Sequence, residues 1–213
     1  MGSLWDDARV ERYIRLYSDP REKKGSQSIL CKDAAEMIEG EQVLDVGCGM
    51  GHLCPFVKPT RYFGVDSSPT MLAKAREFFP DREFNLLEAT EMELPSTFDT
   101  TIAISLLIHL TAEQGHAVLK RMWKHTRKAM VFGMETMKSS EIRRPDGLLI
   151  RTQSLPELIK ELEGMGISRD QVSLWHHKWT YSIQYTVTPS LSDSPLSMTG
   201  GLIQRTTLFK VIK

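Results

Sequence analysis

The sequence predicts an α/β fold: a doubly wound, mostly parallel sheet with an antiparallel last strand and helices on both faces. Short apolar runs of strand type alternate with stretches of helical period, which is the pattern of parallel α/β sheets. The run 100–104 is apolar enough to be buried on both faces of such a sheet. Near the end of the chain, residues 179–188 and 202–212 are rich in β-forming residues and are joined by a Pro, Ser and Gly segment, 189–201. We interpret this pair as an antiparallel ending with a mobile loop between its strands.

The first two helices follow from periodicity and from the signals that end a helix. Apolar residues at i, i+3, i+4 and i+7 predict a helix that Asp19-Pro20 breaks. A second helix, 28–39, ends at Gly40, a residue that adopts the left-handed conformation of a helix stop. Pro55 interrupts a further short helix. The apolar positions of the first helix are Val10, Tyr13, Ile14 and Tyr17.

Capping signals open three more helices between predicted strands. Ser68 is a cap residue, and Pro69 after it suits the first helical position. Two capping-box spacings mark the other two helices. These boxes are Thr111 with Gln114, and Ser154 with Glu157. The predicted parallel strands are 43–46, 61–65, 83–87, 100–104 and 129–134.

Length, charge and cysteine content restrict the class of protein. A chain of 213 residues fits one domain, 1–213. Lys plus Arg and Asp plus Glu are both 27, so no strong field attracts phosphate backbones, and nucleic acid is an unfavoured partner. The cysteines Cys31, Cys48 and Cys54 have no metal-site spacing and fit a reducing cytoplasm. We expect no bound metal and no membrane segment, since no apolar run approaches roughly 20 residues.

Three glycines directly follow the first predicted strand, in the stretch VLDVGCGMG, Val43–Gly51. The turn after a parallel strand lies at the edge of the sheet where α/β proteins bind ligands, and absent Cβ atoms let a ligand approach the backbone. The spacing is not the GxGxxG of nicotinamide enzymes, because His52 stands where that fingerprint needs glycine. Two acids accompany the turn. Asp66 can accept both hydroxyls of a ribose, and Asp45 can orient a ligand ammonium directly or through water.

These residues resemble a known family. The stretch 45–51 resembles the glycine motif of class I S-adenosylmethionine-dependent methyltransferases, and 64–76 resembles their second motif, in order and in register. Phe98-Asp99, followed by a strand and by SLLIHL at 105–110, is similar to the fourth motif. The resemblance covers about residues 5–166. It implies a Rossmann-like fold, S-adenosyl-L-methionine as cofactor and S-adenosyl-L-homocysteine as product.

The resemblance also implies an organisation of the chain and roles for the first strand's residues. Residues 1–40 would form lid helices, and 41–213 the cofactor-binding core. In such enzymes the glycine loop holds the methionine end of the cofactor, and the backbone of the residue matched by Ser105 faces the same end. Cys48 is expected to be a small buried spacer in that loop. The loop positions that match are Asp45, Gly47, Cys48, Gly49 and Gly51.

The ribose and adenine would lie along the second motif. Asp66 would take the ribose hydroxyls. Asp66→Ala is expected to weaken cofactor binding by about 10 to 100-fold, and Asp66→Asn by less. Removal of Asp66 is expected to leave the melting temperature of the empty protein within a few degrees of the wild type. Ser67 and Met71 would flank the adenine, although methionine also fills cores by default. Glu88 and Ala89 match the acid and the backbone amide that pair with the adenine ring. Glutamate is less usual there than aspartate. The sequence leaves open whether Tyr13 or Tyr17 contacts the cofactor.

The sequence says less about the residues that bind the methyl acceptor. Methyl transfer is an in-line displacement, so the acceptor must be aligned and freed of its proton. His109, just past the fourth strand, is the candidate catalytic residue, with Glu135 a weaker one; a structural role for His109 is the alternative. Residues 105–108 lack the Asn/Asp-Pro-Pro-aromatic pattern of enzymes that methylate adenine or cytosine amines. Selection of the acceptor would fall to the first helices, to a loop at 137–151 and to the segment 189–201.

The predicted function is transfer of a methyl group from S-adenosylmethionine to an oxygen, nitrogen or carbon atom of a small-molecule acceptor. We expect a cytoplasmic enzyme with no membrane association. Two alternatives remain open at this level: a protein or RNA methyltransferase, and a catalytically silent cofactor-binding or partner-binding module of the same fold. Fold analogy does not choose between acceptors.

Overall fold

The computed structural model describes residues 7–17, 19–23, 25–58, 62–136, 138–145, 147–176 and 206–213. The helices are α1 (Asp7–Tyr17), α2 (Gly25–Ala35), α3 (Pro69–Phe78), α4 (Ala112–His125) and α5 (Leu155–Gly164). The strands are β1 (Val43–Val46), β2 (Tyr62–Asp66), β3 (Glu83–Leu86), β4 (Phe98–Ala103), β5 (Thr126–Glu135), β6 (Ser140–Arg143), β7 (Leu149–Thr152), β8 (Val172–His176) and β9 (Thr206–Ile212). Short 3₁₀ turns are η1 (Pro20–Glu22), η2 (Cys54–Phe56), η4 (Ala89–Glu91), η5 (Leu107–His109) and η6 (Arg169–Gln171).

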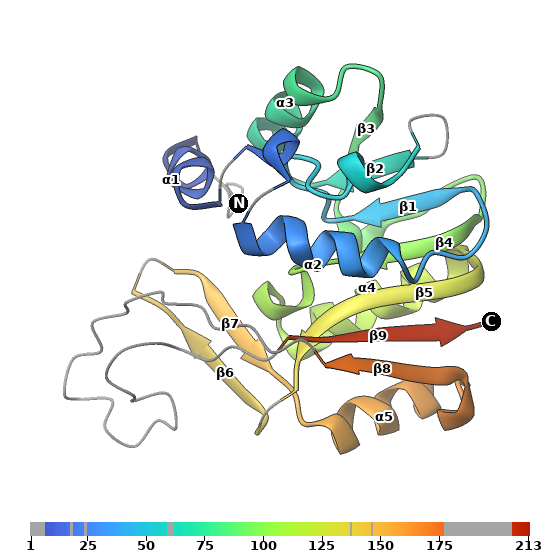
Figure 1. Cartoon of the computed structure of the whole chain (residues 1–213). Helices are drawn as coiled ribbons and strands as arrows, with labels where there is room; N and C mark the ends of the chain where they lie inside the picture. Colours follow the sequence, from blue (N-terminus) through green and yellow to red (C-terminus); the bar gives the residue numbers. More distant parts are fainter. Residues whose placement is uncertain are drawn as a thin grey trace.

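The main sheet has seven strands in the order β3-β2-β1-β4-β5-β9-β8. β1 to β5 are parallel, whereas β9 is antiparallel to both β5 and β8. The predicted fold class is therefore confirmed. β1 connects onward to β2 on one side and lies against β4 on the other, so the order of the strands reverses at β1 (Figure 1). In sheets of this kind the ligand lies where the order reverses, at the carboxyl ends of the strands.

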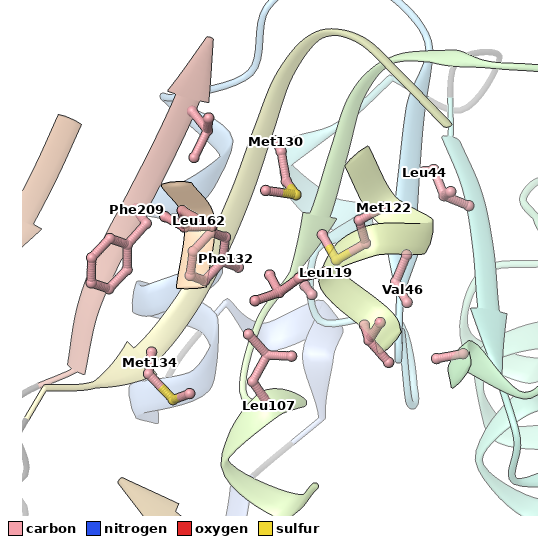
Figure 2. Close-up of a cluster of buried hydrophobic side chains, with 14 of the residues drawn as sticks. Leu44, Val46, Leu107, Leu119, Met122, Met130, Phe132, Met134, Leu162 and Phe209 are labelled. Atoms are coloured by element: carbon pink, nitrogen blue, oxygen red, sulfur yellow. The ribbon is translucent and has the colours of Figure 1, made fainter. Parts of the chain in front are cut away.

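Two apolar clusters fill the two faces of the sheet, because alternate residues of each strand point to opposite sides. On β1, Val43 belongs to the cluster that includes residues of α2 and α3, and Leu44 belongs to the cluster that includes residues of α4 and α5. Figure 2 shows the second face, where Phe132 of β5 and Phe209 of β9 lie against each other with Leu119 of α4 nearby. The two phenyl rings are stacked, with centroids 5.0 Å apart. Burial on both faces explains why the strands are continuous apolar runs.

The predicted second helix, 28–39, is wrong at both ends, since α2 begins at Gly25 and ends at Ala35. The chain after it is held by the start of β4. The carboxylate of Asp99 accepts hydrogen bonds from the backbone N–H groups of Glu41, at 2.8 Å, and of Gln42, at 3.2 Å. Gly40 has a φ of +78°, and a Cβ there would lie 2.6 Å from Asp99. Gly40 therefore serves the turn into β1 and does not end the helix.

One capping box is confirmed in full and the other only in half. Thr111 and Gln114 exchange both hydrogen bonds of the box at the start of α4. α5 does begin after Ser154, but the Ser154 side chain makes no capping bond. The backbone N–H of Ser154 donates instead to the hydroxyl of Ser139, at 2.8 Å, and that hydroxyl also contacts Glu157. Ser154 still hydrogen-bonds the Glu157 carboxylate, so the Glu157 half of the box is present and the Ser154 half is absent.

The segment 137–151, predicted as a loop, contains a β-hairpin. β6 and β7 pair antiparallel, with Ser140 opposite Thr152 and Arg143 opposite Leu149. At the end of the chain the antiparallel pair that the structure describes is β8 with β9. The predicted strand 179–188 and the predicted loop 189–201 lie outside the described residues.

Candidate functional site

The three glycines form the turn at the carboxyl end of β1. The backbone N–H groups of Gly47 and Cys48 both donate to the carbonyl of Val65 in β2, at 2.8 and 3.0 Å. This binds the turn to the end of the neighbouring strand. A hollow of about 270 Å³ lies at the other edge of the sheet, where β2, β3 and β4 begin, and so away from this turn.

Gly49 is the glycine of the turn that faces open space. Gly47, Gly49 and Gly51 have φ values of +71°, +52° and +84°, which side chains rarely adopt. A Cβ on Gly47 would lie 2.9 Å from Leu106, and one on Gly51 would lie 2.9 Å from the Cys54 sulfur, so those two glycines allow close packing. A Cβ on Gly49 would meet no described atom within 4 Å. Gly49 is therefore where a ligand can approach the backbone.

The carboxylate of Asp66 joins the end of β2 to this turn. One oxygen, Oδ2, accepts the N–H of Gly49 at 2.9 Å, and the other, Oδ1, accepts the N–H of Ser68 at 2.8 Å. Burial raises the pKa of Asp66, these two hydrogen bonds oppose that rise, and nearby Glu88 adds to it. The structure has a partly buried carboxylate that, besides lying at the end of β2, organises the glycine turn.

Asp45 lies on the face of the sheet covered by α2 and α3. Its side chain is 4% exposed, and its Oδ2 accepts a hydrogen bond from the Tyr62 hydroxyl at 2.7 Å. Burial raises the pKa of Asp45 to about 7, partly opposed by that hydrogen bond. Tyr62 has no sequence signal beyond its place in a strand. Contact between Asp45 and a ligand ammonium stays a prediction.

The residues predicted to hold the adenine gather beside Asp66. Ser67 is exposed directly after β2, and Met71 is buried in a small cluster with Val10 of α1 and Met50 of the glycine turn. The structure thus gives Met71 a packing role, which the sequence left open. Their contact with a ring stays a prediction.

Glu88 and Ala89, the other two residues predicted to contact the adenine, lie just before and at the start of η4. Glu88 is exposed, and its Oε1 accepts a hydrogen bond from the Thr90 hydroxyl at 3.3 Å. Ala89 is 7% exposed and packs into the core. Glu88 acts electrostatically on Asp66, so the two acids lie at one edge of the site. Their roles toward a cofactor also stay predictions.

Ser105, at the end of β4, has a φ of +59°, which is uncommon for a residue other than glycine. Its hydroxyl donates to Oε1 of Gln27 in α2, at 3.0 Å. α2 is thereby joined to the loop that follows β4. A single glutamine in a helix carries no sequence signal for such a contact, so Gln27 could not be predicted.

His109 lies in η5, after β4, and contacts the β6–β7 hairpin. Its Nδ1 is 3.0 Å from the carbonyl of Leu149 in β7. Because a carbonyl only accepts, Nδ1 carries the proton and the neutral ring has its lone pair on Nε2. Burial lowers the pKa of His109, the Leu149 bond opposes this, and the charges of Arg144 and Arg9 lower it further. His109 is therefore neutral at pH 7, as a proton acceptor must be.

The hairpin is also fixed to the start of α4. The carboxylate of Glu141 accepts the N–H of Ala112 at 2.8 Å. Arg151 is 3% exposed, and its guanidinium lies against Gly115, where an added Cβ would be 2.5 Å from Nη2. Its Nη1 donates to Gln153 at 3.0 Å. The hairpin forms a wall beside His109, and nothing in the sequence marks Arg151 as part of it.

α1 lies against the glycine turn from the other side. The ring of Tyr13 meets the ring of His52 edge to face, with centroids 6.1 Å apart. His52 is 5% exposed, and burial lowers its pKa to about 4. A neutral histidine therefore fills the position where a nicotinamide fingerprint would have glycine. The side chain of Tyr17 is outside the described set.

Comparisons with known proteins support the fold. Residues 43–129 match the family model described as "Methyltransferase domain". Magnesium protoporphyrin IX methyltransferase from Synechocystis, with bound SAM, is 15% identical over 97% of this chain and 92% of that one, with a TM-score of 0.64. The 1,6-didemethyltoxoflavin-N1-methyltransferase from Burkholderia thailandensis, with its substrate and S-adenosylhomocysteine, is 14% identical over 100% and 91%, with a TM-score of 0.61.

A further solved structure, an S-adenosylmethionine-dependent methyltransferase from Clostridium acetobutylicum, is 13% identical over 94% of this chain and 95% of that one, with a TM-score of 0.60. Likenesses at such identities establish the fold. The search of curated proteins finds no match. Among the helices described in the structure, none has the length and apolar character needed to cross a membrane.

Proposed function

We propose that this chain, a class I S-adenosylmethionine-dependent methyltransferase, transfers the methyl group to an oxygen, nitrogen or carbon atom of a small-molecule acceptor. The observation that carries the proposal is the open backbone at Gly49, whose N–H is bound to the Asp66 carboxylate at 2.9 Å. A turn without side chains beside a carboxylate suits a ligand that combines an amino acid with a ribose.

The residues present fit S-adenosylmethionine. Each carboxylate oxygen of Asp66 accepts one backbone N–H and has a further lone pair, so both can still accept a ribose hydroxyl. The space at Gly49 would take the methionine portion, and Asp45 lies beneath the same turn. When bound, the cofactor supplies an electrophilic methyl group on a positively charged sulfur.

His109 is the residue that we assign to the acceptor's proton. Its neutral ring is oriented by the Leu149 carbonyl, so Nε2 is the basic nitrogen. Arg144 and Arg9 act on the ring and favour its neutral form. A hydroxyl acceptor would need this base, and an amine would need only to arrive neutral. Glu135, 5% exposed at the end of β5, is the weaker candidate.

A small acceptor is supported by charge and by the shape of the wall. The formal net charge is +0, so the chain has no general attraction to nucleic acid. The β6–β7 hairpin and α1 both place residues around His109, as the effects of Arg144 and Arg9 on its pKa indicate. Two of the similar solved structures are methyltransferases of magnesium protoporphyrin IX and of 1,6-didemethyltoxoflavin, which are small molecules.

The test is a screen for release of S-adenosylhomocysteine from S-adenosylmethionine with three separate pools: small metabolites, total RNA and denatured cell protein. Release that depends on the metabolite pool, and that Asp66→Ala abolishes, is the expected result. Release only with RNA or protein would favour the alternative acceptor class. Cofactor binding with no release from any pool would identify a silent module.

A further inference from the structure

We propose that Asp45, held by the Tyr62 hydroxyl beneath the glycine turn, loses a proton when the cofactor binds, so that cofactor binding and proton release are coupled. This inference rests on the proposed function, because it needs the positively charged end of the cofactor to lie above Asp45. In it, Asp45 is the counter-ion, and Tyr62 is a positioning residue that acts through Asp45.

The geometry isolates Asp45 from water and from cations. Asp45 is 4% exposed and Tyr62 is 3% exposed, and the hydroxyl–carboxylate distance is 2.7 Å. Among the described residues, the charged group that acts on Asp45 is Asp66, which is itself an acid. The guanidinium of Arg82 stands over the Tyr62 ring, 5.7 Å from its centroid, and donates to the carbonyls of Val57 and Cys54. Within the part of the chain that the structure describes, the carboxylate therefore has a hydrogen-bond donor beside it but no paired cation.

The remaining titratable groups near Asp45 do not compete for its proton in the neutral range. Cys31 of α2, Cys48 of the glycine turn and Cys54 of η2 are all buried, and burial raises the pKa of each thiol above its usual value. Burial likewise raises the pKa of Tyr62. These four groups stay protonated around pH 7, which leaves the two acids, Asp45 and Asp66, as the groups here that can change charge.

A buried acid without a cation binds its proton more tightly than an exposed one. The pKa of Asp45 is about 7, against an ordinary value of 3.8. The empty protein therefore holds this proton to a much higher pH than an exposed aspartate does. A positive charge within roughly 4–6 Å favours the ionised acid. The ammonium of the cofactor, placed at the glycine turn, would do so: the O–H bond of Asp45 breaks, and the proton passes to the buffer.

Tyr62 sets the pH range of the exchange. Its hydroxyl donates to the ionised carboxylate and so stabilises it, which lowers the pKa below the value that burial alone would produce. Without that donor, Asp45 in the empty protein would keep its proton to higher pH. Tyr62→Phe should therefore move proton release to higher pH while leaving the carboxyl group in place.

Titration calorimetry with S-adenosylhomocysteine tests the coupling. Binding is measured at one pH in two buffers with different ionisation enthalpies, and the difference in heat counts the protons. The wild type should release more protons at pH 6 than at pH 8, because the empty protein holds the Asp45 proton at the lower pH. Asp45→Asn, which keeps an oxygen for the Tyr62 hydroxyl, should lose this release. The control is Asp81→Asn, an exposed acid whose Oδ1 lies 3.8 Å from Arg82, and it should match the wild type.

Equal proton release in the wild type and in Asp45→Asn would overturn the inference. Infrared difference spectra of the wild type with and without S-adenosylhomocysteine at pH 6 give a second reading that needs no variant. A protonated-carboxyl band should disappear on binding, and an unchanged band would also overturn the inference. Methyl transfer in the acceptor screen combined with either negative result would leave the proposed function standing.

Discussion

Asp66→Asn should be as damaging to the empty protein as Asp66→Ala, although it changes only one atom of the side chain. Both carboxylate oxygens accept a backbone N–H, from Gly49 at 2.9 Å and from Ser68 at 2.8 Å. An asparagine has one carbonyl oxygen and one NH₂ group. In either orientation, the NH₂ faces a backbone donor and one of the two bonds is replaced by a donor–donor contact. The sequence predicts a milder effect of asparagine on cofactor affinity, whereas for the stability of the empty protein the two hydrogen bonds predict equal effects of the two changes.

The size of the effect follows from these two bonds. A hydrogen bond to a charged acceptor contributes about 1.5–3 kcal/mol. Burial of Asp66, which raises its pKa, offsets part of that gain. We expect each variant to lose about 2 kcal/mol, which for a chain of this size lowers the melting temperature by about 4–8 °C.

Scanning calorimetry of the ligand-free variants measures this loss. Hydrogen exchange of the peptide that contains Gly49 supplies a local reading, because its amide should exchange faster once the carboxylate acceptor is gone. Asp81→Asn is again the matched control, since Asp81 is exposed and contacts only the Arg82 side chain at 3.8 Å in the described structure. A melting temperature of Asp66→Asn within about 1 °C of the wild type, with unchanged exchange at Gly49, would refute the reasoning.

Further predictions concern the base, the buried acid and the wall of the site. His109→Ala should lower turnover by ~10² while cofactor affinity stays near the wild-type value, and full activity of the variant would make His109 structural. Because burial lowers the pKa of His109, wild-type activity should persist below pH 6.5 before it falls. The pKa of Asp45 in the folded protein, about 7, lies above the ordinary 3.8, so its ionisation destabilises the fold as pH rises between those values. Asp45→Asn should therefore gain up to about 4 kcal/mol over the wild type by pH 8 in calorimetric unfolding, with no gain near pH 4. Gly115→Ala should destabilise by about 1–3 kcal/mol through contact with Arg151, whereas Gly164→Ala, whose Cβ would meet nothing described within 4 Å, should be near neutral in thermal unfolding. S-adenosylhomocysteine at ~100 times its dissociation constant should stabilise the wild type by about 2.7 kcal/mol, and a melting point that rises with NADH instead would contradict the cofactor assignment.

Local sequence determined the elements that depend on neighbouring residues. β1 begins and ends where the apolar run does, Ser68 caps α3 with Pro69 at its first position, and Thr111 forms the predicted box with Gln114. Each of these signals acts over four residues or fewer, so no distant residue is needed to complete it. The same holds for the turn conformation of Gly49, which its missing side chain permits.

Tertiary structure decided every feature that joins residues far apart in the chain. Asp66 reaches Gly49 across 17 residues, His109 meets Leu149 across 40, and Ser105 meets Gln27 across 78. The sequence correctly placed most of these residues at one edge of the sheet, because the ends of parallel strands lie together. It did not reveal which side chains they would contact, since a hydrogen bond depends on positions to within a fraction of an ångström.

The β6–β7 hairpin also shows the difference between local sequence signals and contacts made by distant residues. Its sequence is polar enough to be predicted as a loop, and all four β6 residues are exposed. The two strands pair with each other, and contacts with distant elements hold the hairpin in place: Glu141 with the start of α4 and Leu149 with His109. Residue types and their order determined the sheet and the glycine turn with its two acids. Packing determined that Asp66 holds the turn together and that Asp45 lies buried against Tyr62, because burial and hydrogen-bond partners exist only once the chain has folded.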